Sequence, residues 1–132
     1  MAESPTTLKR ILLVDDDPGQ IKLLEKILAN SGYEVITAQD ASLGLQWVID
    51  KRPALVILDV MMPIINGYNF CRIVKSEMKQ KDIAIILLTS RDKLEDIQIG
   101  MDMGADAYLI KPVHTDELLR TIKVVESMQH KR

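Results

Sequence analysis

The chain has 132 residues, of which 47% are hydrophobic and 27% are charged, and its formal net charge is −2. This length suits a single domain with one core, while the weak charge argues against a general affinity for nucleic acid. The single cysteine excludes an intrachain disulfide. The sequence shows neither a signal peptide nor an apolar run of the ~20 residues that span a bilayer. We therefore predict a cytoplasmic protein.

A hydrophobic run at residues 11–14 leads directly into three acidic residues, Asp15, Asp16 and Asp17. A short run of Ile, Leu and Val that stops at polar residues is typical of a buried strand. The carboxylates of Asp15 and Asp16 are therefore expected at the carboxyl end of that strand.

A helix is predicted over residues 18–31, where apolar side chains recur every three or four positions and Gly32 follows the end. Asp17 is well placed to cap this helix, because Pro18 suits the first helical position and Gln20 would complete a capping box. We therefore assign Asp17 to the helix rather than to a binding site.

The next two elements are a strand at residues 33–37 and a helix at residues 41–51, which ends before Pro53. The strand alternates apolar and polar residues more than the other runs do. This pattern favours a position at the edge of the sheet.

The third hydrophobic run, residues 54–58, ends at one isolated carboxylate, that of Asp59. Five consecutive apolar residues are typical of a strand that is buried on both faces. A loop that contains Met61 then leads to a helix after Gly67. The inward residues of that helix are spaced by four and are expected to be Phe70, Val74 and Met78.

Two further runs, residues 83–88 and 107–110, end at a hydroxyl and at an ammonium group, those of Thr89 and Lys111. The last helix is predicted over residues 115–128. The helix between the two runs is expected to face inward through Leu94, Ile97 and Met101.

Strict alternation of strands and helices implies a parallel sheet with right-handed crossovers and helices on both faces. Open parallel sheets bind ligands in the crevice outside the carboxyl ends of their strands, where these polar groups emerge. Carboxylates about 4 Å apart repel by roughly 4 kcal/mol at an effective dielectric near 20. The usual remedy is a hard divalent cation bound by oxygen ligands, so the acidic groups predict a metal site.

The ordered set of Asp15-Asp16, Asp59, Thr89, Tyr108 and Lys111-Pro112 resembles the receiver domain of two-component response regulators, over about residues 9–125. The resemblance implies an α/β, flavodoxin-like, doubly wound (βα)5 fold, whose five-stranded parallel sheet has the order 2-1-3-4-5. It also implies a receiver domain at residues 9–128, a flexible tail at residues 1–8, and a tail or the start of a linker at residues 129–132.

In this family one aspartate accepts a phosphoryl group, and the resemblance gives that role to Asp59. It further implies that magnesium (Mg²⁺) is the cofactor. The metal would be bound directly by Asp16, by Asp59 and by the backbone carbonyl of Met61, and through water by Asp15.

The resemblance also gives roles to the other strand ends. Lys111 and the Thr89 hydroxyl would contact phosphoryl oxygens, and a cis peptide bond before Pro112 would orient Lys111 inward. Thr89 and Tyr108 would form a switch that changes the surface made by the fourth helix, the fifth strand and the fifth helix.

The phosphoryl donor implied by the resemblance is a sensor histidine kinase or a phosphotransfer protein. The expected recipient of the signal is an output domain or a partner protein that contacts the switching surface. Neither direct nucleic-acid binding by this domain nor a membrane contact is expected. Its catalysis would be limited to its own phosphorylation and dephosphorylation, so it is not expected to be an enzyme.

Three other interpretations fit parts of the pattern. A flavodoxin-like ligand-binding protein would need Ser, Thr and Gly after the first strand, where this chain has acidic residues. A phosphatase of the haloacid dehalogenase type would need a second aspartate two residues after the nucleophile, where this chain has Met61. A degenerate receiver that only binds proteins, independently of phosphorylation, would lack site residues, and every group of the set is present.

Overall fold

The structure of the chain is a computed structural model that describes residues 9–129. The predicted tail at residues 1–8 and residues 130–132 of the predicted C-terminal tail lie outside the described residues. None of the helices within residues 9–129 combines the length and the hydrophobicity needed to cross a membrane.

Strands and helices alternate along the chain, and α3 continues as a short π-helical segment, η2. The elements are β1 (Arg10–Val14), α1 (Pro18–Asn30), β2 (Glu34–Ala38), α2 (Ala41–Lys51), β3 (Leu55–Leu58), α3 (Gly67–Arg72), η2 (Ile73–Glu77), β4 (Ala84–Thr89), α4 (Leu94–Asp102), β5 (Ala107–Ile110) and α5 (Thr115–Gln129).

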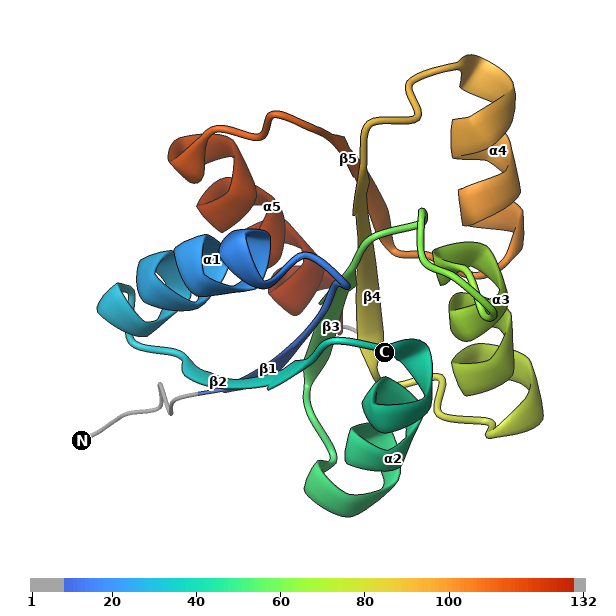
Figure 1. Ribbon diagram of the computed structural model, residues 1–132, viewed down its shortest axis with the longest axis horizontal. Helices are drawn as coiled ribbons and strands as arrows, with labels where there is room; N and C mark the ends of the chain where they lie inside the picture. Colours follow the sequence, from blue (N-terminus) through green and yellow to red (C-terminus); the bar gives the residue numbers. More distant parts are fainter. Residues whose placement is uncertain (1–8, 130–132) are drawn as a thin grey trace.

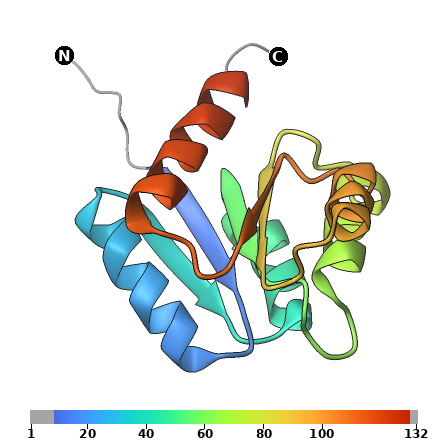
Figure 2. The ribbon, with the colours of Figure 1, turned by 90° about the horizontal axis from the view of Figure 1, so that it is seen from above.

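The five strands form one parallel sheet in the order β2-β1-β3-β4-β5, which confirms the predicted doubly wound α/β fold. Helices α1 and α5 cover one face of the sheet, and α2, α3 and α4 cover the other (Figure 1, and from above in Figure 2). β2 lies at an edge and is only partly buried, as its alternating sequence predicts.

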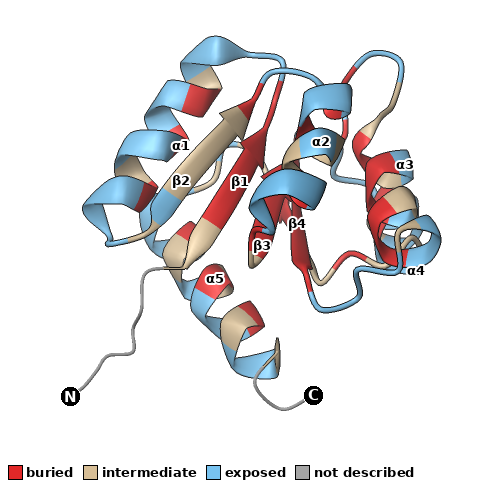
Figure 3. Ribbon diagram, turned by 90° about the horizontal axis from the view of Figure 1, so that it is seen from below, coloured by how far each residue is buried: buried red, intermediate tan, exposed pale blue. Residues whose placement is uncertain are grey.

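The sheet separates two hydrophobic cores, because successive residues of a strand point to opposite faces. On the face covered by α1 and α5, Ile11 of β1 packs in one cluster with Leu118 of α5. On the other face, Leu12 shares a cluster with Phe70 of α3. The buried side of each helix faces the sheet and its outer side is exposed (Figure 3). This packing fixes the strand ends, and with them the polar groups that follow.

The start of α1 confirms one prediction and corrects another. The carboxylate of Asp17 caps the helix by accepting the backbone N–H groups of Gly19 (2.9 Å) and Gln20 (3.5 Å). The predicted capping box is wrong, because the backbone N–H of Asp17 donates to the carboxylate of Asp15 at 2.9 Å rather than to the Gln20 side chain. Asp15 therefore connects the turn of residues 15–17 to the cap residue of α1.

The predicted inward face of α4 is wrong at two of its three positions. Leu94 is 85% exposed and Met101 is 43% exposed, while Ile97 is partly buried. The buried residues of this helix are Asp96 and Gly100. A carboxylate and a glycine carry no hydrophobic signal, so the periodicity of apolar residues points to the wrong face.

Candidate functional site

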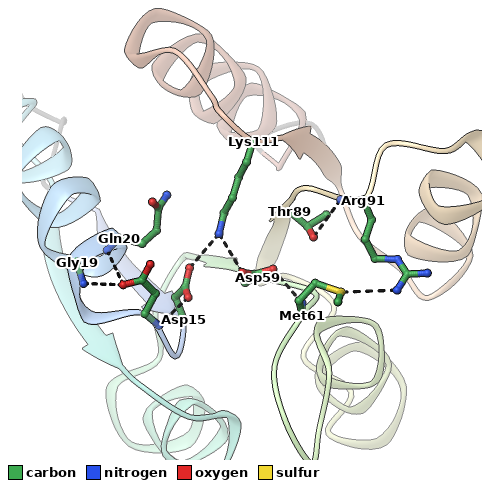
Figure 4. Close-up of polar contacts among 9 residues, drawn as sticks. Asp15, Gly19, Gln20, Asp59, Met61, Thr89, Arg91 and Lys111 are labelled. Atoms are coloured by element: carbon green, nitrogen blue, oxygen red, sulfur yellow. Dashed lines mark hydrogen bonds and ion pairs between the residues drawn. The ribbon is translucent and has the colours of Figure 1, made fainter.

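The strand register brings the predicted polar groups to one edge of the sheet. Asp15 and Asp59 directly follow residues that are paired between β1 and β3. Thr89 is the last residue of β4 and pairs with Ile110, the last residue of β5. Lys111 directly follows Ile110. In Figure 4 the Lys111 side chain reaches down to Asp15 and Asp59.

Asp59 is a buried carboxylate whose two oxygens have different partners. Its Oδ2 lies 2.9 Å from the ammonium nitrogen of Lys111, and its Oδ1 accepts the backbone N–H of Met61 at 2.9 Å. The side chain is only 11% exposed. The carboxylate is therefore held in one orientation at the end of a central strand.

Asp15 is the second buried carboxylate, and it shares the same ammonium group. Its Oδ2 lies 3.4 Å from Lys111 Nζ. Burial raises the pKa of the Asp15 carboxyl above its ordinary value, and the Asp17 N–H and the charge of Lys111 offset this only in part. Asp16, the residue between Asp15 and Asp17, is exposed.

Lys111 balances two carboxylates with one positive charge. Burial alone would lower the pKa of the Lys111 ammonium, but the hydrogen bond to Asp59 and the charge of Asp15 outweigh it, and the pKa lies above the ordinary value. The Lys111–Pro112 peptide bond is cis, as the resemblance implies. One negative charge remains in excess in this cluster.

Thr89 is fully buried, and its hydroxyl oxygen accepts the backbone N–H of Arg91 at 3.4 Å. The guanidinium of Arg91 donates from Nε and Nη2 to one oxygen of Asp96, at 3.2 and 3.0 Å, and its Nη1 lies 3.6 Å from the sulfur of Met61. The side chains of Arg91 and Met61 therefore meet beside Asp59 (Figure 4).

Tyr108, the predicted switch residue, is half-buried and turned toward the loop after β4. Its hydroxyl donates to the backbone carbonyl of Arg91 at 2.9 Å and lies 3.2 Å from the hydroxyl of Tyr68. Tyr68 and Asp96 are not among the residues that the sequence predicts for this region. Asp96 left no signal in the sequence, because an acidic residue on a helix is expected to face solvent. Tyr68 left none, because Tyr68 and Tyr108 are 40 residues apart in the chain.

The predicted Mg²⁺ ligands offer only oxygen atoms, from two carboxylates and a backbone carbonyl, and such ligands suit a hard divalent cation. Within residues 9–129, no three acidic, histidine or cysteine side chains form a ready group for a metal ion. The two buried carboxylates are instead neutralised in part by Lys111. The residues fit a cation by their chemistry and by their excess negative charge, while the ligand group itself is not preformed.

Comparison with known families finds one match that covers most of the chain. The family described as "Response regulator receiver domain" matches residues 11–123. The DNA-binding response regulator MtrA of Mycolicibacterium smegmatis is 35% identical over 118 residues, which are 89% of this chain and 50% of that protein. The response regulator MprA of Mycolicibacterium vanbaalenii is 40% identical over 116 residues, or 88% of this chain and 49% of that protein. The chain thus spans about half the length of these relatives.

Solved structures with the same fold cover nearly the whole chain. The chemotaxis response regulator CheY4 of Vibrio cholerae is similar with a TM-score of 0.84 and 33% identity, over 90% of this chain and 99% of that one. A CheY-like response regulator receiver domain protein from Methanospirillum hungatei gives a TM-score of 0.87 and 33% identity, over 95% and 98%.

Proposed function

The chain belongs to the response regulator receiver family, and from this premise we propose that it accepts a phosphoryl group on Asp59. The observation that carries the proposal is the geometry of that carboxylate. It lies at the carboxyl end of central strand β3, with Lys111 Nζ 2.9 Å away and a second carboxylate on the same ammonium.

The donor in this proposal is a phosphohistidine of a sensor histidine kinase or of a phosphotransfer protein. An oxygen of Asp59 forms a bond to phosphorus, and the bond between phosphorus and the imidazole nitrogen breaks, with its electron pair left on the imidazole. The transferring group spreads negative charge over its phosphoryl oxygens, so the protein assists the reaction mainly by positioning the groups and neutralising this charge. Lys111 supplies a positive charge at one oxygen, and the hydroxyl of Thr89 donates to another.

The cofactor in this proposal is Mg²⁺, held by the carboxylates of Asp16 and Asp59 and by the backbone carbonyl of Met61, with Asp15 contacting it through water. When bound, the ion would supply positive charge to a phosphoryl oxygen. Asp15 also positions Lys111, because the two groups form an ion pair.

The signal in this proposal passes from Thr89 to Tyr108 and changes the surface of α4, β5 and α5, where an output domain or a partner protein would bind. The hydrogen bonds from the Arg91 N–H to Thr89 and from Tyr108 to the Arg91 carbonyl support this route. One relative is called DNA-binding, but it is twice as long as the matched region. We propose that this domain itself binds neither nucleic acid nor membrane and acts in the cytoplasm as a signalling domain rather than an enzyme.

The proposal is tested by incubation with a small acyl phosphate and Mg²⁺, followed by intact-mass measurement. We expect one added phosphoryl group in the wild type, none after chelation of the metal, and none in Asp59→Asn. Asp50→Asn is the matched control, because Asp50 is an exposed aspartate on α2 and should leave the labelling unchanged. Labelling of Asp59→Asn at the rate of the wild type would contradict the assignment.

A further inference from the structure

Two tyrosine hydroxyls meet between α3, α4 and β5, outside the contacts that the phosphotransfer step uses. The hydroxyl of Tyr68 donates to the backbone carbonyl of Asp96 at 3.0 Å. The hydroxyl of Tyr108 donates to the backbone carbonyl of Arg91 at 2.9 Å, and the two hydroxyl oxygens are 3.2 Å apart. These contacts form a row of four oxygen atoms that crosses from α4 to the loop after β4.

The row has three contacts but only two hydroxyl protons, because each phenol carries a single O–H. Tyr68 donates to the carbonyl of Asp96, so the single proton of Tyr108 is shared between two acceptors, the carbonyl of Arg91 and the oxygen of Tyr68. When Tyr108 loses the carbonyl of Arg91, its proton can turn to the oxygen of Tyr68. Tyr68 therefore offers Tyr108 a second acceptor that does not depend on the position of the loop.

The ring of Tyr108 lies in a slot against α4 that only a glycine leaves open. A Cβ added to Gly100 would lie 2.9 and 3.1 Å from two ring atoms of Tyr108 and 2.9 Å from Cδ1 of Leu87. Burial raises the pKa of the Tyr108 phenol well above its ordinary value, and the hydrogen bond with Tyr68 adds to this rise. The ring is thus enclosed by Gly100 on one side and held at its hydroxyl by Tyr68.

We propose that Tyr68 is a positioning residue for the switch, whose hydroxyl holds the Tyr108 ring in the slot against Gly100. The role of Tyr108 as a switch rests on the proposed function. The inference adds α3 to the elements that control the switching surface, since Tyr68 contacts both α4 and β5. If the loop after β4 moved the Arg91 carbonyl away, the Tyr108 hydroxyl would donate to the oxygen of Tyr68, and the Tyr108 ring would stay in the slot.

Tyr68→Phe removes one oxygen and keeps the ring, so it tests the hydroxyl alone. The chain has three tyrosines, which makes selective labelling of tyrosine rings for NMR simple. In the unphosphorylated wild type we expect a strong nuclear Overhauser effect between the Tyr108 ring and the α-protons of Gly100. Tyr68→Phe removes one of the two acceptors of the Tyr108 proton, so we expect the ratio of Tyr108 rings inside the slot to rings outside it to fall by up to about fivefold, the effect of one hydrogen bond. Gly100→Ala gives the reference spectrum of a displaced ring.

Tyr33→Phe is the matched control, because the Tyr33 hydroxyl contacts Glu126 on the other side of the molecule. It should leave the Tyr108 signals at their wild-type positions. Tyr108 signals in Tyr68→Phe that stay at the wild-type position, or that move equally in Tyr33→Phe, would overturn the inference. The unphosphorylated chain is used, so the reading is independent of phosphoryl uptake by Asp59, on which the proposed function depends.

Discussion

Two lysine–aspartate pairs lie at opposite ends of the sheet, and they differ in their charge balance. At the amino end of β5, Lys75 Nζ contacts Asp106 Oδ2 at 2.9 Å, and the side chains are only 11% and 9% exposed. The same oxygen of Asp106 accepts the backbone N–H of Ile85 at 2.8 Å. One positive charge meets one negative charge, and the pair joins the π-helical segment to β4 and β5.

At the carboxyl end, the ammonium of Lys111 is shared by Asp59 and Asp15, and its side chain is 24% exposed. Here two carboxylates meet one ammonium in a place that solvent reaches. In the first pair one carboxylate opposes one ammonium, whereas the unbalanced cluster keeps a negative charge that a cation can neutralise. We therefore expect the first pair to stabilise the fold and the second cluster to bind a cation.

The same substitution at the two ends should have opposite consequences for stability. Asp106→Asn leaves Lys75 buried beside a neutral amide, and breaking a buried ion pair costs about 3 kcal/mol. Asp59→Asn leaves one ammonium with one carboxylate, so the free energy of unfolding should stay the same or rise. Urea denaturation of both variants measures the difference, and equal losses of stability would remove the distinction.

Mg²⁺ should raise the stability of the chain through the carboxyl end alone. An ion that binds only the folded state adds about 2.7 kcal/mol at a hundredfold excess over its Kd. Thermal melts with Mg²⁺ and with a chelator should show the rise in the wild type and in Asp106→Asn, and not in Asp59→Asn. Retention of the full rise in Asp59→Asn would place the ion elsewhere.

The loops at the two ends also differ in the residues they hold at positive φ. Arg52 (φ 45°) and Lys79 (φ 58°) lie at the amino end, and Ile64 (φ 70°) lies at the carboxyl end, in the loop after Asp59. A β-branched residue tolerates this region least. Ile64 is fully exposed, so Ile64→Gly loses no packing, and we expect it to raise the melting temperature by about 4 °C.

Arg52→Gly and Lys79→Gly are the controls for this prediction. Neither side chain is β-branched, so each substitution should raise the melting temperature less than Ile64→Gly does. A drop in the melting temperature of Ile64→Gly would show that the side chain contributes to the folded state.

The smallest expected effect concerns Cys71 of α3, near the balanced pair. Burial raises the pKa of its thiol to about 12, from an ordinary 9.0, with Lys75 lowering it and Asp106 raising it. Because the thiolate is the reactive form, Cys71 should react with a thiol reagent at pH 8 only after unfolding. Since the unfolded thiol ionises first, stability should also fall as pH rises from about 9 towards 12, less steeply in Cys71→Ala. Rapid labelling of the folded chain would contradict this.

The sequence predicted the elements that depend on local signals. Four strands were visible as apolar runs and β2 as an alternating segment. The groups that follow the runs, such as Asp59 and Lys111, lie together because a parallel sheet collects its carboxyl ends at one edge. The strand order came from the family resemblance rather than from periodicity, and the structure confirms it.

The failures of prediction occur where distant residues decide the local structure. The inward face of α4 is set by the ion pair of Asp96 with Arg91 and by the Tyr108 ring against Gly100, and neither contact leaves a hydrophobic period. The predicted capping box is wrong because a side chain outside the helix, that of Asp15, accepts the N–H of the cap residue.

We propose that the unbalanced carboxylate cluster receives a phosphoryl group on Asp59. The most direct measurement is to phosphorylate the chain with a small acyl phosphate and Mg²⁺, reduce it with borohydride, and map the product by peptide mass spectrometry. Borohydride converts an aspartyl phosphate to homoserine, so we expect homoserine at position 59 and at no other aspartate, with none when Mg²⁺ is chelated. Homoserine at Asp15, Asp16 or another position, with Asp59 unchanged, would contradict it.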